Sequence, residues 1–285
     1  MTTLTHPTDP ARTDTPSVSS GPGLSFAALI RSEWIKLWSV RSTVWSLSLV
    51  VVVSLGMAAV MAWATTLQLD SMGGATDLSV LPAAEQAGIV LQAATFGIFF
   101  GQLIVAVLGV LVISGEYSTG MIKSTLTAVP RRLGALAAKA VVLFACTFAV
   151  GIVSTVGSFL VAAPMLAGEG LSVSLFGPTV LLALLGASLY LGLVAVFALG
   201  IGTILRSAAG GIAAVLGALL LLPIVLSMVP AQWATDASPY LLSNAGTALF
   251  STTTTMDPWQ GLLVVLGWIV AAGGLAAVLL RKRDA

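Results

Sequence analysis

SGEYSTGMIKSTLTAVPRR, residues 114–132, is a polar stretch set between two long apolar runs. It carries Glu116, Lys123, Arg131 and Arg132, whereas the runs on either side are almost free of charge. A charged side chain at the centre of a bilayer costs about 3 kcal/mol on insertion scales. The stretch therefore predicts a loop outside the hydrocarbon, between two membrane-spanning helices.

The composition supports a membrane protein. Of the 285 residues, 58% are hydrophobic and only 8% are charged, and the mean hydropathy is +1.05. A soluble domain carries about 25% charged residues, so this chain could not cover its own surface in water. The class is all-α and polytopic. The few, scattered Lys and Arg residues exclude a phosphate-tracking face, so no nucleic-acid partner is expected.

Six apolar runs are long enough to cross a bilayer, which takes about 20 residues in a helix. Aromatic side chains such as Trp63 and Trp259 fall near the predicted ends, where interface anchors belong. Arg206 separates the fourth run from the fifth, because one uninterrupted helix there would be far longer than the membrane is thick. The predicted spans are residues 44–65, 95–114, 138–163, 179–204, 208–230 and 259–280.

The charges predict the topology. With the tail residue Arg12 included, every Lys and Arg falls on one side of the six spans. The charged residues in the loops on the other side are all acidic, for example Glu85 and Glu169. Because positive residues stay in the cytoplasm, both termini and the 115–137 loop are predicted to be cytoplasmic. Six spans also bring both termini to the same side of the membrane, in agreement with the charges.

Two segments precede the first span. Residues 1–23 are rich in Thr, Pro and Ser and predict a disordered cytoplasmic tail rather than a signal peptide. Residues 24–285 form the membrane domain. Within it, residues 25–41 predict an amphipathic helix along the cytoplasmic interface, although Glu33 intrudes near its apolar face. The alternative is that this segment is the start of the first span, which its positive charges disfavour. The residues assigned to the interfacial helix are Arg31, Trp34, Lys36, Trp38 and Arg41.

No catalytic pattern is visible. The sequence has no phosphate-binding loop and no nucleophile elbow, and its single histidine, His6, cannot form a metal cluster. We expect no enzyme activity, no bound cofactor and no metal. No predicted span has an ionisable residue near its middle, which argues against ion-driven transport. Cys146 is predicted to be a packed thiol rather than a reactive one.

Small and polar residues mark the inner faces of the spans. Gly97 and Gly101 form a Gly-x-x-x-Gly step, and Gly267 with Ala271 forms a similar one. Packing within one subunit is favoured over a dimer seam. Gln102 needs a partner in hydrocarbon, so it either faces a substrate path or makes an interhelical hydrogen bond.

The loop has its own pattern. The second span is expected to end at residues 114–115, because Gly suits a helix terminus. Residues 118–128 could form a short amphipathic helix, and Pro130 would stop it. A short amphipathic helix beneath the membrane would be a docking surface for a soluble partner.

These residues resemble the signature loop of ATP-binding-cassette (ABC) exporter permeases of type-2 topology. The pattern is Gly-Glu-Tyr-x-x-Gly, a short apolar and hydroxyl stretch, then Pro-x-Arg. Met121 departs from it, since the family more often has Thr there. The resemblance covers residues 25–283, and the matching residues are Gly115, Glu116, Tyr117, Gly120, Leu126, Pro130 and Arg132.

The resemblance implies a permease subunit of a bacterial plasma membrane that moves its cargo outward, and the apolar composition suggests that this cargo is lipophilic or amphipathic. Two six-span halves, identical or related, would rest on two copies of a cytosolic ATPase that binds ATP and Mg. Glu116 is expected to tie the loop to a nearby Lys or Arg. The alternative is a non-transporting scaffold or immunity protein. The implied coupling residues are Glu116, Tyr117, Gly120, Lys123, Leu126, Pro130, Arg131 and Arg132, beside the 25–41 helix.

Overall fold

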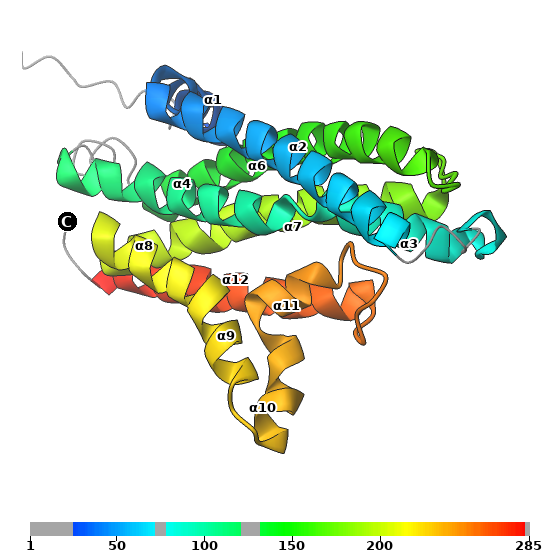
Figure 1. Ribbon diagram of the computed structural model, residues 1–285. Helices are drawn as coiled ribbons and strands as arrows, with labels where there is room; N and C mark the ends of the chain where they lie inside the picture. Colours follow the sequence, from blue (N-terminus) through cyan, green and yellow to red (C-terminus); the bar gives the residue numbers. More distant parts are fainter. Residues whose placement is uncertain (1–24, 72–77, 121–131, 283–285) are drawn as a thin grey trace, which may run out of the picture.

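The computed structural model describes residues 25–71, 78–120 and 132–282, and within these ranges all regular structure is helical. Six helical stretches are long and apolar enough to cross a membrane, as predicted. Figure 1 shows them as a bundle with α7 in its interior. The helices are α1 (Phe26–Ser39), α2 (Arg41–Ser71), α3 (Ala83–Thr95), α4 (Ile98–Ser118), α6 (Arg132–Ala167), α7 (Pro178–Leu205), α8 (Ala208–Leu216), α9 (Leu222–Ser227), α10 (Gln232–Ala237), α11 (Leu242–Thr247) and α12 (Pro258–Lys282). A π-helical segment, Gly217–Leu221, joins α8 to α9, and short 3-10 helices lie at Leu78–Val80 and Ser238–Tyr240.

Helix α7 forms the core. It packs against α4, α6 and α12. Of its most apolar 18-residue stretch 67% is buried, whereas the corresponding share for α12 is 17%. Glycines allow the close approach of its neighbours: a Cβ on Gly109 of α4 would lie 2.5 Å from the carbonyl oxygen of Ala195 in α7. Cys146 is buried near this core, as predicted.

The predicted Gly-x-x-x-Gly faces divide into two cases. A Cβ on Gly97 would lie 2.5 Å from Cα of Ser54, so this glycine packs α4 onto α2 within the subunit, as expected. A Cβ on Gly267 would meet nothing within 4 Å in the described structure. The step at Gly267 and Ala271 therefore does not bring two helices of this subunit together.

The second span differs from its predicted bounds, 95–114, at both ends. Its apolar stretch is preceded by α3, so Glu85 lies in the first turn of a helix, where a carboxylate is favourable, and not in a loop. At the other end α4 continues through Gly115 to Ser118. It ends instead at Gly120, whose φ of 70° is the left-handed conformation that glycine allows after a helix.

The turn at Arg206 is present as predicted. Arg206 takes a left-handed φ of 53°, and the Ser207 side chain accepts a hydrogen bond from the backbone N–H of Gly210 to start α8. The fifth helix then ends at Ser227 and not at residue 230.

The last part of the fifth helix, α9, and the next helix, α10, lean away from the bundle, and α11 brings the chain back against α12 (Figure 1). Helix α11 buries Leu242 and Ala245 in the protein.

The helices that contain most of the other predicted spans extend beyond them. Helix α2 begins at Arg41 and ends at Ser71, so it includes Asp70, which was expected in a loop. Helix α6 begins at Arg132 and reaches Ala167, although Pro164 lies inside its last turns. Charged residues therefore occupy the helix ends, beyond the apolar windows from which the predictions were made.

Candidate functional site

Four charged side chains meet where α1, α4 and α6 come together at one end of the bundle. Lys139 of α6 lies 2.5 Å from Oε2 of Glu33 and 2.9 Å from Oε1 of Glu116. Lys36 lies 2.7 Å from Oε1 of Glu33 and 3.5 Å from Oε1 of Glu116. Each carboxylate therefore pairs with both ammonium groups. We call these four residues the charged cluster.

The charged cluster is mostly removed from solvent. The side chains of Glu33, Glu116 and Lys139 are 7%, 8% and 7% exposed, and only Lys36, at 34%, reaches the surface. Two positive and two negative charges balance, which is what burial of ions requires. The cluster therefore fastens α1 to the end of α4 and to the start of α6.

The local sequence explains the geometry. Glu33 and Leu37 are one helical turn apart on α1 and are the two buried residues of that helix. Because α4 continues past Gly115, Glu116 lies in its last turn and faces α1. Lys139 lies two turns into α6, and its long side chain reaches back between the two carboxylates.

The charged cluster changes the protonation of the groups on α1. Burial alone would raise the pKa of the Glu33 carboxyl, but Lys139 and Lys36 outweigh it and hold this pKa below its usual range. Burial alone would lower the pKa of the Lys36 ammonium, but Glu33 and Glu116 raise it above its usual range. Both groups stay charged at neutral pH.

The pH dependence follows from these directions. Glu33 has a lowered pKa in the folded state, so its stabilisation is full above its unfolded pKa and is lost as the pH falls below about 4. Lys36 has a raised pKa, so its contribution is lost only as the pH rises beyond about 10. We expect α1 to stay docked from about pH 6 to 9 and to loosen in acid.

A spin label on α1 measures this docking. Arg31→Cys in a Cys146→Ser background places the label on an exposed position of α1, and Ser48→Cys supplies a control on α2. The label at residue 31 should become mobile near pH 3.5 while the control does not. Equal mobility of the first label at pH 3.5 and pH 7 would contradict the role given to Glu33.

A cavity of about 430 Å³ lies beside the charged cluster. All four charged residues line it, together with apolar side chains of α4 such as Leu108 and Leu111. A second contact lies nearby, where the guanidinium carbon of Arg206 is 5.2 Å from the ring centre of Tyr117. The turn after α7 is thus also joined to the end of α4.

Among the predicted coupling residues, the structure places those at the start of the loop. Glu116 and Tyr117 lie in the last turn of α4, and Gly120 ends that helix. Arg132 is the first residue of α6. The other four predicted coupling residues lie outside the described residues: Lys123, Leu126, Pro130 and Arg131. The same holds for residues 121–128 of the short helix expected at 118–128.

The predicted residues of the first helix separate into two groups. Lys36 joins the charged cluster. Trp34 and Trp38 are 47% and 45% exposed, with ring centres 5.8 Å apart, and the side chain of Trp38 also contacts Cys146 of α6. Arg31 and Arg41 are exposed, and neither is part of the charged cluster.

Glu33 and Lys139 were missed as site residues. Each could have been identified as a charged residue among apolar neighbours. Glu33 lies beside the apolar face of its helix, and Lys139 lies inside the predicted third span. The expected partner of Glu116 is observed, since Glu116 pairs with Lys36 and Lys139.

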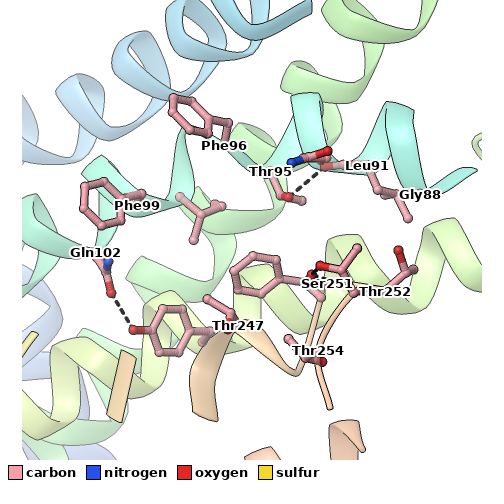
Figure 2. A pocket seen from close by; sticks show the side chains of 15 residues that line it. Gly88, Leu91, Thr95, Phe96, Phe99, Gln102, Thr247, Ser251, Thr252 and Thr254 are labelled. Atoms are coloured by element: carbon pink, nitrogen blue, oxygen red, sulfur yellow. Dashed lines mark hydrogen bonds between the residues drawn. The ribbon is translucent and has the colours of Figure 1, made fainter. Parts of the chain in front are cut away.

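A second cavity, of about 360 Å³, lies between α3, the start of α4, α7 and the segment that follows α11 (Figure 2). Tyr190 of α7 donates a hydrogen bond to Oε1 of Gln102 across 2.5 Å, and both side chains are buried. Of the two roles left open for Gln102, the interhelical hydrogen bond is present, and the same side chain also lines the cavity.

Comparison with known proteins assigns no family. No family model matches the chain, and no curated protein matches it significantly. Within residues 25–71, 78–120 and 132–282, His, Cys, Asp and Glu side chains form no group that could hold a metal ion.

Proposed function

We propose that this chain is the membrane subunit of an ATP-driven ABC exporter, energised by an ATPase on a separate chain. The observation that supports it best is the charged cluster, which fastens α1 to both helices that flank residues 119–131. An ATPase pressing on that loop would also press on α1. The loop pattern described above suggests the ABC exporter family. The charged cluster would transmit the motion of the ATPase from the loop and α1 to α4 and α6.

The route runs from the loop into the core. Lys139 joins α6 to α4 through Glu116, and both helices pack directly on α7. A displacement of α1 or of the loop would therefore move α4 and α6 as one unit against α7. Such rigid-body motion of packed helices is the usual form of a transport transition.

The exposed face of α1 fits the same proposal. The rings of Trp34 and Trp38 are about half exposed at the border between α1 and the bundle, where a helix along the cytoplasmic interface would meet lipid. The charged cluster then faces the protein, and its end of the bundle is the cytoplasmic end in this proposal. Two such chains, resting on two ATPase chains, would complete the exporter in a bacterial plasma membrane.

The first test is a search for the partner. The tagged chain, purified from its own membranes, should carry a bound protein with a Gly-x-x-x-x-Gly-Lys-Ser/Thr loop. In liposomes the chain should raise that protein's ATP hydrolysis severalfold. Absence of both the bound protein and the stimulation would overturn the proposal in favour of a non-transporting scaffold.

A matched pair of variants then tests the route. Glu116→Gln removes one charge from the charged cluster and should lower the stimulation of ATP hydrolysis at least about threefold, since it weakens both ion pairs that join α4 to α1 and α6. Glu85→Gln makes the same change on α3, outside the charged cluster, and should leave the stimulation unchanged. Equal rates in the two variants would show that the charged cluster does not carry the coupling.

A further inference from the structure

We propose that the second cavity, beside Gln102 and Tyr190, binds an uncharged amphiphile with a hydrogen-bond acceptor in its head and an apolar tail. The identification of this ligand as the cargo rests on the proposed function, whereas the binding itself does not. The cavity, about 360 Å³, is within the size range of small-molecule sites. The ligand class follows from the polar groups, the charge and the openings of its walls.

The walls combine aromatic rings with hydroxyl and amide groups. Phe96 and Phe99 stand on one side and Gln102 lies at one end (Figure 2), and Phe250 also lines the cavity. A row of small hydroxyl side chains completes the lining: Thr95, Thr247, Ser251, Thr252, Thr253 and Thr254. An apolar wall with a few directed polar groups is the usual pattern of a site for a small organic molecule.

The hydrogen bonds already made decide which polar groups remain for a ligand. Thr95 and Thr247 donate to the backbone oxygens of Leu91 and Asn244, both at 2.7 Å. The carbonyl oxygen of Gln102 accepts from Tyr190, which leaves its amide nitrogen, a donor of two N–H groups, for the cavity. The cavity thus offers a donor beside its aromatic wall, and its natural partner is a carbonyl, ether or hydroxyl oxygen.

The charge of the lining excludes ionic heads. No Asp, Glu, Lys or Arg is among the described residues that line this cavity. A phosphate or ammonium head would lose its hydration there without gaining a counter-charge, at a cost of several kcal/mol. The charged cluster cannot supply one, because Glu116 lies 14 residues further along α4 than Gln102, about 21 Å at about 1.5 Å per residue.

The openings indicate the direction of entry. Phe96 and Phe99 are 38% and 48% exposed on the lateral surface of a membrane helix, so this side opens toward lipid. Gly88 and Thr252 instead lie close together in the wall, since a Cβ at position 88 would lie 3.0 Å from the threonine hydroxyl. A ligand dissolved in the bilayer can therefore enter between the phenylalanine rings and place its head against Gln102.

Photo-crosslinking tests the proposal without ATP or an ATPase. The full chain, in phosphatidylcholine nanodiscs, is irradiated with diacylglycerol that carries a diazirine in one acyl chain. The crosslinks should fall in residues 88–102 and 247–254. Phosphatidate with the same labelled chain should label these residues at least about fivefold less, because its head is charged. Labelling outside these residues, or equal labelling by phosphatidate, would overturn the proposal.

Matched variants identify the groups involved. Gln102→Met should lower the labelling about three- to tenfold, as the loss of one hydrogen bond predicts. Gln68→Met, at an exposed position of α2, should not change it. Phe99→Ala should also lower labelling while Phe176→Ala, 81% exposed elsewhere, does not. This second pair keeps the test valid if Gln102→Met fails to fold, and unchanged labelling in Phe99→Ala would contradict the site.

The two proposals can fail separately. If the cavity is labelled but the chain binds no ATPase, the binding site is supported and the exporter proposal is wrong. If the chain stimulates an ATPase but diacylglycerol does not label it, the exporter proposal is supported and the binding-site proposal is wrong.

Discussion

Replacing Lys139 with methionine should lower the free energy of unfolding by about 3–5 kcal/mol, the usual cost of removing one partner from buried ion pairs. Methionine keeps most of the length of the lysine side chain and removes the charge. Glu33 and Glu116, both buried, would then share Lys36 alone. Two carboxylates with one partly exposed cation form an unbalanced site, and we expect α1 to separate from the bundle.

Cys146 supplies the measurement. It is the only cysteine of the chain and is 4% exposed in the core, so a thiol-reactive dye reacts with it only as the protein unfolds. The midpoint temperature of that reaction should fall by several degrees in Lys139→Met. Lys282→Met, in the last turn of α12, removes the same charge outside the charged cluster and should leave the midpoint unchanged.

A second substitution distinguishes charge balance from packing. Adding Glu116→Gln to Lys139→Met leaves Glu33 paired with Lys36 and removes the surplus negative charge. At least half of the lost stability should return. If the double variant is as unstable as Lys139→Met, lost packing explains the effect; if Lys139→Met melts like Lys282→Met, the charged cluster does not stabilise the fold.

The charged cluster also shows what the sequence could not predict. Its members come from three helices, and Glu33 is 106 residues from Lys139. Hydropathy and charge counts locate spans and loops, because each needs only a local average over about 20 residues. They carry no information on which helix faces which. The sequence could mark Glu33 and Lys139 as unusual charges, but only the packing of α1 on α6 brings them together.

The helices extend beyond the predicted spans for a related reason. The apolar windows ended where the charges began, yet α2 and α4 continue through Asp70 and Glu116. A helix keeps its own backbone hydrogen bonds beyond the hydrocarbon, so charge ends the span without ending the helix. The turn at Arg206 was predicted correctly because the length of the apolar stretch around it left no alternative.

The second cavity depends on the return of the chain after α10. Gln102 was identifiable from the sequence as a polar side chain in hydrocarbon. Its partner Tyr190 and the hydroxyl-rich segment 251–254 were not, because Thr and Ser residues are as frequent in ordinary loops. Packing of α11 between α7 and α12 places that segment against α3.

Gly186→Ala tests this packing and should be the second most damaging change, at about 2–3 kcal/mol or more. A Cβ on Gly186 of α7 would lie only 2.0 Å from the carbonyl oxygen of Leu249 and 2.8 Å from its carbonyl carbon. The obstacle is backbone, so no side-chain rotation relieves it. The segment after α11 must move away from α7, and the reaction of Cys146 with dye should begin at a lower temperature.

Gly267→Ala is the matched control, because a Cβ there meets nothing within 4 Å of the described chain. It should melt at the temperature of the unmodified protein or slightly above it, because alanine is favoured over glycine inside a helix by up to about 1 kcal/mol. Equal melting of the two variants would show that the segment after α11 does not pack on α7 as the structure places it. Leu249 lies between Thr247 and Phe250, both of which line the second cavity. Gly186→Ala should therefore lose diacylglycerol labelling even at temperatures where it remains folded. Retained labelling in that variant would mean that the ligand binds without the segment after α11.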